Sequence, residues 1–455
     1  MNGIGPRGSP EALAMLEQRL RAEPGDYVAR HNLAVELRRL DRADEALAAI
    51  ERAWADGARG PETALMLGHI RADHGEFTAA ITAYQAAIVA QPDLIDAQTT
   101  LTSLLPQIGR GDEALAGFHA ALARAPDTGM LWVAAMAAAK AQRDHLQLLA
   151  WADAAEQRFG SDTMVTTFAA LALSAMGRDE DARQRLARAL ALEPDYAAGH
   201  ATMAHVLLRL GDPAAAAEAA LTATRLSPGD QSAWALLGVA WRLLGDPREH
   251  WLCDYERLVM PIEIGLPAGL DQALAARHLA HAHPADQSLR GGTQTRGNLF
   301  ESADPVITAL ARQIADAVGA RLRALPEDAA HPFLGRNTGA VDFVGSWSVR
   351  LASEGFHISH IHPAGWLSSA LYVSLPDAVT AGRGAGALAF GVPDAALGLD
   401  LPARRVVQPR EGLLVIFPSY LWHGTTPFAD TSPRLTLAFD AVPTNPEVDN
   451  GAAQR

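Results

Sequence analysis

Three histidines and one arginine in the last quarter of the sequence have residue types and spacing that suit a metal site. His360 and His362 are separated by a single residue in the segment HISHIH. Residues two apart on a β-strand point to the same face, so we expect both imidazoles to point together. His423 follows the apolar segment GLLVIFP, which we expect to form another strand. Three histidines that converge from two strands can bind a divalent transition metal.

Arg434 and Thr436 extend this pattern toward an anion. Arg434 lies eleven residues beyond His423 and begins the segment RLTLAFDAV, with Thr436 two positions later. The alternation of a strand places both on one face. An arginine directed into an apolar barrel needs an anion, and a carboxylate matches its bidentate fork. A metal beside a carboxylate anchor describes a site for a small keto acid.

Short β-type segments must position these side chains. From residue 341 onward, segments rich in β-branched and aromatic residues alternate with Gly and Pro turns. Seven strands at roughly even spacing predict a sandwich or small barrel of jelly-roll type. The segments are VDFVGSWSVRL, HISHIH, WLSSALYVSL, GALAFGV, RRVVQP, GLLVIFP and RLTLAFDAV.

The segment before this barrel predicts a few flanking elements. Residues 251–264 mix aromatic and β-branched residues, which favours an entry strand. Residues 273–278 and 306–325 are expected to form helices. Between these helices, the segment QSLRGGTQT is expected to form a loop around its two glycines.

The first half of the chain is built from a 34-residue repeat. Alanine recurs at that interval, and proline closes the same frame in most of the units. A fixed period of this length indicates stacked helical hairpins, in which small side chains let the paired helices approach closely. The repeating alanines are Ala53, Ala87, Ala121, Ala155, Ala189 and Ala223.

This repeat resembles the tetratricopeptide repeat over about residues 27–244, with a half-repeat at 10–23 as a cap. The resemblance implies a concave groove that binds a protein or peptide partner, and the alternative is a spacer or a dimerisation surface. We therefore expect a multidomain α plus β protein. Residues 10–246 would form an all-α tetratricopeptide solenoid, residues 247–445 a double-stranded β-helix (jelly-roll) domain with flanking helices, and residues 446–455 a disordered tail.

The run GFHISHIHPAGWLSSALYVSLP, followed by FPSYLWHGTTPF and SPRLTLAF, resembles the 2-oxoglutarate- and Fe(II)-dependent oxygenases. These are double-stranded β-helix enzymes, sometimes fused to tetratricopeptide repeats, and the resemblance covers about residues 250–445. The family motif is a His-x-Asp/Glu pair, a distant His and an Arg about ten residues further on. The resemblance implies that His360 and His423 bind iron. It also implies that Arg434 and the Thr436 hydroxyl bind the distal carboxylate of 2-oxoglutarate, while Tyr372 could donate a hydrogen bond to the same cosubstrate.

The chain departs from the family at His362, where a carboxylate is usual. Three arrangements stay open: His362 completes a three-histidine site, a carboxylate such as Asp342 or Glu354 replaces it, or the site binds metal poorly. We expect the first, and His362→Asp should then preserve or improve turnover. His357 precedes His360 by three residues, which places it on the opposite face of a strand unless a bulge intervenes.

The expected function is an Fe(II)- and 2-oxoglutarate-dependent dioxygenase, most simply a hydroxylase. It would use molecular oxygen, release succinate and act on a protein or peptide recruited by the repeats. One alternative is a non-catalytic scaffold whose barrel is a degenerate metal or ligand site. Another is a three-histidine dioxygenase of cupin type that needs no 2-oxoglutarate, although Arg434 argues against it.

The composition of the chain argues against several classes of partner and location. The net charge of −14 argues against nucleic acid, which is bound through clustered Lys and Arg. The single cysteine, Cys253, excludes an intrachain disulfide framework. The sequence contains no stretch of eighteen apolar residues, so we expect no membrane span. The first twenty residues lack the apolar core of a signal peptide. We expect a cytoplasmic protein.

Overall fold

A computed structural model describes the chain over residues 9–40, 42–283, 288–295, 298–302 and 304–444. The predicted tail at 446–455 lies outside these residues. The chain divides into two compact units, residues 1–176 and 177–455. The division falls within the repeats, whereas the predicted boundary at residue 246 marks where the repeat pattern ends, and that boundary stays a prediction.

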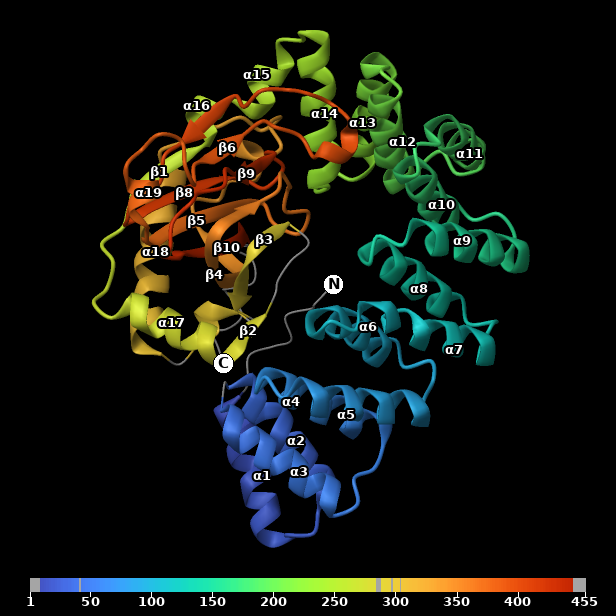
Figure 1. The fold of residues 1–455 in the computed structure, drawn as a ribbon, viewed down its shortest axis with the longest axis vertical. Helices are drawn as coiled ribbons and strands as arrows, with labels where there is room; N and C mark the ends of the chain where they lie inside the picture. The colour runs from blue at the N-terminus through green and yellow to red at the C-terminus, as the bar shows by residue number, and fades with distance from the viewer. Residues whose placement is uncertain (1–8, 41, 284–287, 296–297, 303, 445–455) are drawn as a thin grey trace. The chain divides into compact units, whose positions relative to one another are not determined.

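The first unit consists of antiparallel helix pairs (Figure 1). The repeating alanines lie on the second helix of each pair, and Ala53, Ala87, Ala121 and Ala155 are buried where the helices pack. The 34-residue period therefore reflects close helix contact. The helices are α1 (Pro10–Ala22), α2 (Tyr27–Arg39), α3 (Ala43–Ala55), α4 (Pro61–Asp73), α5 (Phe77–Ala90), α6 (Ile95–Leu104), α7 (Ala116–Arg124), α8 (Gly129–Ala141), α9 (His145–Phe159) and α10 (Thr163–Ala175).

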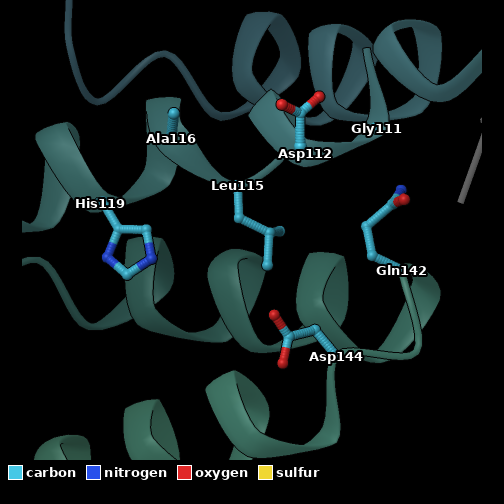
Figure 2. Close-up of a pocket in the computed structure, with 7 residues that line it drawn as sticks. All are labelled: Gly111, Asp112, Leu115, Ala116, His119, Gln142 and Asp144. Carbon is cyan, nitrogen blue, oxygen red and sulfur yellow. The ribbon is translucent and has the colours of Figure 1, made fainter. Parts of the chain in front are cut away.

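One repeat of the first unit is irregular. Pro106 cannot donate a backbone hydrogen bond, and the chain passes from α6 into a 3₁₀ turn at Leu105–Ile108. A second 3₁₀ turn, Gly111–Glu113, precedes the short helix α7. A cavity of about 510 Å³ that opens to solvent lies beside this turn (Figure 2). It is lined by Gly111, Asp112, Leu115, Ala116, His119, Gln142 and Asp144.

The second unit begins with the last repeats and continues into the barrel. Its repeat helices are α11 (Asp179–Leu192), α12 (Ala197–Arg209), α13 (Pro213–Leu226) and α14 (Gln231–Leu244). The shorter α15 (Arg248–Cys253), α16 (Tyr255–Leu258) and α19 (Asp377–Thr380) and the flanking helices α17 (Leu270–His281) and α18 (Pro305–Arg323) follow.

Two antiparallel sheets form the barrel (Figure 1), so the predicted fold class is confirmed. The larger sheet has the order β1-β8-β5-β10-β4-β3-β2, and the smaller one the order β7-β6-β9. The strands are β1 (Met260–Glu263), β2 (Ala282–His283), β3 (Leu289–Thr295), β4 (Val341–His357), β5 (Leu367–Ser374), β6 (Leu388–Phe390), β7 (Arg405–Val407), β8 (Leu413–Pro418), β9 (His423–Thr425) and β10 (Arg434–Pro443).

A single hydrophobic core runs from the last repeats into the barrel. It includes Leu237 and Trp241 of α14 together with Leu371 and Phe417 of the larger sheet. Arg242 of α14 donates hydrogen bonds to the carbonyl oxygens of Gly391 and Pro402, each at 2.6 Å. The last repeats and the loop after β6 are therefore one packed structure within this unit.

Three local predictions were wrong. Residues 251–264 form α15, α16 and only the short strand β1, because the Asp254 side chain caps α16 by accepting from the Arg257 backbone. The predicted glycine loop contains β3, where Gly292 lets β3 approach β4: a Cβ there would lie 2.7 Å from the Arg350 carbonyl oxygen. The segment HISHIH is no regular strand, since β4 ends at His357 and only an isolated bridge follows.

No helix in the described part of the chain combines the length and the apolar composition needed to cross a bilayer.

Candidate metal centre

The three predicted histidines meet at one place. His360 pairs with His423, the first residue of β9, through two backbone hydrogen bonds of 2.9 and 3.0 Å. Gly424 allows this pairing, because a Cβ there would lie 2.9 Å from the His357 carbonyl oxygen. Across this bridge, the ligand nitrogens of His360, His362 and His423 all lie within 4.8 Å of one another. This isolated bridge, and not a regular strand as expected, therefore positions the histidines.

Hydrogen bonds fix the orientation of each imidazole. The Nδ1 atom of His360 donates to the Ile358 carbonyl at 2.8 Å, and that of His423 donates to the Leu421 carbonyl at 2.9 Å. The Nδ1 atom of His362 lies 2.8 Å from a carboxylate oxygen of Asp440. An Nδ1–H that is held by an oxygen acceptor leaves the lone pair on Nε2. All three rings therefore have the tautomer that binds a metal through Nε2.

The spacing of the nitrogens also fits a metal ion. The Nε2 atoms of His360 and His362 are 3.2 Å apart. Two neutral rings with protons on Nδ1 cannot hydrogen bond through these atoms, because both are acceptors. Two nitrogens that bind one metal at about 2.1 Å and at right angles lie about 3 Å apart. Imidazole donors suit Fe, Zn, Cu and Ni.

Burial keeps the centre in its metal-binding protonation state. His423 is only 5% exposed and its ring packs against Phe417 at 4.6 Å between ring centroids. Burial, followed by the neighbouring rings of His360 and His362, lowers the pKa of His423 well below its usual value. The ring is therefore neutral at pH 7, as metal binding requires.

Asp440 is a site residue that the sequence analysis missed. Its carboxylate accepts from Nδ1 of His362 and, at 2.7 Å, from the Ser368 hydroxyl. Carboxylates in this position orient a ligating imidazole and increase its basicity. Asp440 lies on β10 four residues after Thr436 and six after Arg434, so the alternation already applied to those two residues identifies its face.

We predict that Asp440→Asn lowers the Fe(II) affinity of the protein about 10- to 100-fold, because the amide keeps the shape of the side chain and loses the charge that polarises His362. Anaerobic equilibrium titration with Fe(II) measures this. Asp342→Asn is the matched control, since Asp342 is exposed on β4 of the same sheet and lies outside the histidine cluster. Equal affinity of the Asp440 variant and the wild type would remove Asp440 from the site.

Arg434 is a buried cation that lacks a carboxylate partner in the described part of the chain. It is 2% exposed, and Nη1 donates to the Gly386 carbonyl at 2.7 Å, while the buried Nε has no hydrogen-bond partner among the residues that the structure describes. Burial lowers the pKa of Arg434, since a desolvated charge is unfavourable. A buried guanidinium of this kind is suited to an incoming anion.

Tyr372 and Thr436 lie beside this guanidinium. The Arg434 guanidinium carbon is 4.9 Å from the centroid of the Tyr372 ring. The Tyr372 hydroxyl is buried and has no hydrogen-bond partner among the described residues. Thr436 pairs with Tyr372 in register between β10 and β5, and its hydroxyl donates to the Val349 carbonyl at 3.4 Å. The three predicted anion-site residues therefore lie together, and two of them have buried polar atoms without partners.

Family comparison agrees with this geometry. Residues 345–440 match the family described as "Putative 2OG-Fe(II) oxygenase", and residues 202–249 match a tetratricopeptide repeat. Part of the barrel is thus similar to this oxygenase family. The matched residues include all three histidines, Arg434, Thr436, Tyr372 and Asp440.

Solved structures resemble the helical part. A tetratricopeptide repeat protein from Parabacteroides merdae ATCC 43184 is 16% identical, with 50% of this chain and 90% of that chain covered and a TM-score of 0.34. Yeast Tom70 is 17% identical, with 52% of each chain covered and a TM-score of 0.38. At these TM-scores neither structure informs the function of this chain. No curated protein matches the sequence.

The remaining candidates lie outside the histidine cluster. Asp342 and Glu354 are exposed and are not part of the histidine cluster. Cys253 is buried, and burial raises the pKa of its thiol to about 12, which leaves it unreactive. Trp366 stacks on Phe333 in the core.

Proposed function

We propose that the protein is a 2-oxoglutarate- and Fe(II)-dependent oxygenase, a hydroxylase that acts on a protein or peptide brought to it by the repeats. The observation that carries the proposal is a three-imidazole cluster in the same small barrel as a buried arginine that has no carboxylate partner among the described residues. The first suits a divalent metal and the second suits a carboxylate. A ligand that satisfies both is a keto acid with a second carboxylate.

Different residues of this chain would bind the metal and the cosubstrate. His360, His362 and His423 would hold Fe(II), with Asp440 orienting His362. Arg434, with the hydroxyls of Tyr372 and Thr436, would hold the distal carboxylate of 2-oxoglutarate. When bound, Fe(II) would supply the oxidation by molecular oxygen that couples loss of carbon dioxide from 2-oxoglutarate to hydroxylation of the substrate. The protein would provide orientation and a site with little water.

The charges also fit this assignment. Three neutral imidazoles leave the full charge of a divalent ion uncompensated in its inner shell. Asp440 supplies one negative charge through His362, in place of the carboxylate that most of the family carries at that position. The 2-oxoglutarate dianion would supply the rest, with its distal charge opposite Arg434.

The repeats are proposed to recruit the substrate. Stacked helical hairpins form a surface suited to peptides or other proteins. In the second unit, α12 and α14 belong to the same hydrophobic core as the barrel. A chain segment bound to these helices would therefore be tethered beside the barrel at a raised effective concentration.

Anaerobic spectroscopy tests the proposal. Addition of Fe(II) and then 2-oxoglutarate should give the visible charge-transfer band of a keto acid bound to Fe(II), and oxygen should then produce succinate. Iron binding without the band or succinate would favour a cupin-type three-histidine dioxygenase. Absence of iron binding would favour a scaffold with a degenerate barrel.

Asp440 changes what we expect of His362→Asp. The new carboxylate would face the Asp440 carboxylate, and two neighbouring like charges disfavour each other. We predict that the single variant binds Fe(II) at least about 10-fold more weakly, and that the double variant His362→Asp/Asp440→Asn recovers much of the affinity, because one carboxylate then joins two imidazoles. Parallel Fe(II) titrations of wild type, both single variants and the double variant measure this. If the loss of Fe(II)-binding free energy in the double variant equals the sum of the losses in the two single variants, the two residues act independently.

A further inference from the structure

Two buried serine hydroxyls extend the contact between His362 and Asp440 into the core. Ser368 on β5 pairs in register with Asp440 on β10, and its hydroxyl donates to the Asp440 carboxylate at 2.7 Å. The Ser419 hydroxyl lies 2.8 Å from that of Ser368, and both serines are 0% exposed. A chain of three hydrogen bonds therefore connects the core with the ring of a proposed metal ligand.

The direction of this chain follows from the number of hydrogens. A serine hydroxyl has one hydrogen, and that of Ser368 is directed to the Asp440 carboxylate. The hydrogen between the two serines therefore comes from Ser419. The carboxylate only accepts, so Nδ1 of His362, at 2.8 Å, donates to it from the other side. Asp440 is the acceptor at which both ends of the chain meet.

Ser419 is fixed to the loop that carries His362. Its backbone N–H donates to the Trp366 carbonyl at 3.0 Å, and its own carbonyl accepts from the His362 backbone N–H at 3.1 Å. Gly365 in the same loop leaves room for the Ser419 hydroxyl, because a Cβ there would lie 2.5 Å from that oxygen. The start of the hydroxyl chain and the proposed ligand are thus held in one local structure.

The hydroxyls compete with water for the orientation of Asp440. The Asp440 side chain is 14% exposed, so solvent reaches part of it, whereas both serines lie on its dry side. A carboxylate oxygen that loses a buried donor is unfavourable until it turns toward water. An outer carboxylate strengthens a ligating imidazole only while it accepts from that ring. Ser368 can therefore act on a bound metal through the direction in which the carboxylate faces.

We propose that Ser368 and Ser419 are positioning residues of the metal centre, which hold the Asp440 carboxylate toward His362 and so strengthen the bond of this imidazole to the metal. The inference rests on the proposed function. Each hydroxyl acts only through the next group in the chain. The effect on metal affinity should therefore decrease from Asp440 to Ser368 and again from Ser368 to Ser419.

The test measures affinity for Co(II), which binds nitrogen ligands and reports its coordination by visible absorption. Ser368→Ala should bind Co(II) about 10-fold more weakly than the wild type, and Ser419→Ala about 4-fold, because Ser368 still donates there. The matched control is Ser369→Ala, the same change at the next residue of β5. Ser369 is also buried, but its hydroxyl hydrogen bonds with the Phe439 backbone. This control should stay within about 2-fold of the wild type.

A double variant separates positioning from packing. In the Asp440→Asn background the charge is absent, so adding Ser368→Ala should weaken Co(II) binding by less than about 2-fold. An undiminished loss in this background would overturn the inference, because the hydroxyl would then act on the fold and not through the carboxylate.

Thermal melts of the metal-free proteins show whether each variant folds. If Ser368→Ala does not fold, Ser419→Ala is measured in the same two backgrounds. Wild-type Co(II) affinity in the folded Ser368 variant, or in the Ser419 variant where that one replaces it, would overturn the assignment. Failure of the wild-type protein to bind Co(II) or Fe(II) would refute the proposed function, and this inference with it.

Discussion

Replacement of His423 by alanine is expected to abolish Fe(II) binding in the micromolar range. The substitution removes one of three nitrogens whose ligand atoms lie within 4.8 Å of one another, and it leaves a buried gap beside Phe417 that cannot supply another ligand. Loss of a residue that only orients a ligand already costs about 10- to 100-fold in metal affinity, so loss of the ligand itself should cost more than about 100-fold. Anaerobic Fe(II) titration, followed by metal analysis of the desalted protein, gives the result.

Folding and metal binding must be separated in this experiment. His423 also pairs with His360 through backbone hydrogen bonds, which alanine retains. Circular dichroism and a thermal melt of the metal-free proteins should show a loss of no more than a few kcal/mol in the free energy of unfolding, as for other large-to-small changes in a core. His331→Ala is the control, because His331 is a buried histidine of the same unit that hydrogen bonds backbone groups and is outside the cluster. A folded His423 variant with full iron occupancy would remove His423 from the metal centre.

Arg434→Met is expected to weaken 2-oxoglutarate binding by about 30-fold or more and to leave Fe(II) binding nearly unchanged. The guanidinium is the buried cation that would pair with the distal carboxylate, and truncating one partner of a buried charge pair costs about 2 to 5 kcal/mol. Methionine fills much of the same volume without a charge. The concentration of 2-oxoglutarate that gives half of the charge-transfer band measures the change.

Without ligand, the Arg434→Met variant should be nearly as stable as the wild type. Removal of an unpaired buried charge is favourable, and loss of the hydrogen bond to the Gly386 carbonyl costs about 1 kcal/mol. Arg350→Met is the matched control, since Arg350 is exposed on the adjacent strand β4. A normal 2-oxoglutarate requirement in a folded Arg434 variant would assign the carboxylate anchor to another residue.

The helical repeat could be predicted from the sequence, apart from the irregular unit that contains α6 and α7. Its signal is local: each helix pair needs a small residue where its helices cross, and the same need returns every 34 residues, as at Ala53 and Ala87. The strand segment GLLVIFP was equally clear, because a central strand buried on both sides is a continuous apolar run. The segment RLTLAFDAV was clear from its alternation of polar and apolar residues.

The candidate site was predictable only where strand alternation held. Arg434 and Thr436 lie on β10, which pairs with β4 without a register shift from Arg434 to Asp440, and the sequence grouped them as the structure does. Asp440 follows the same alternation, but it was missed because its partner His362 lies 78 residues away in the chain. Alternation failed around His357, since a bulge at Glu354 changes the face and no single residue in the sequence announces it.

Sequence alone thus determined the helical repeat and the β-rich second part, and it singled out the three histidines and the arginine as a candidate site, because each depends on residue type and short-range period. Tertiary structure alone decided the isolated bridge that brings His360 to His423, the hydrogen bond from His362 to Asp440, and the burial of Arg434 away from any carboxylate in the described part of the chain. These depend on contacts between residues far apart in the chain. Such contacts are fixed by the packing of whole sheets and leave no periodic pattern in the sequence.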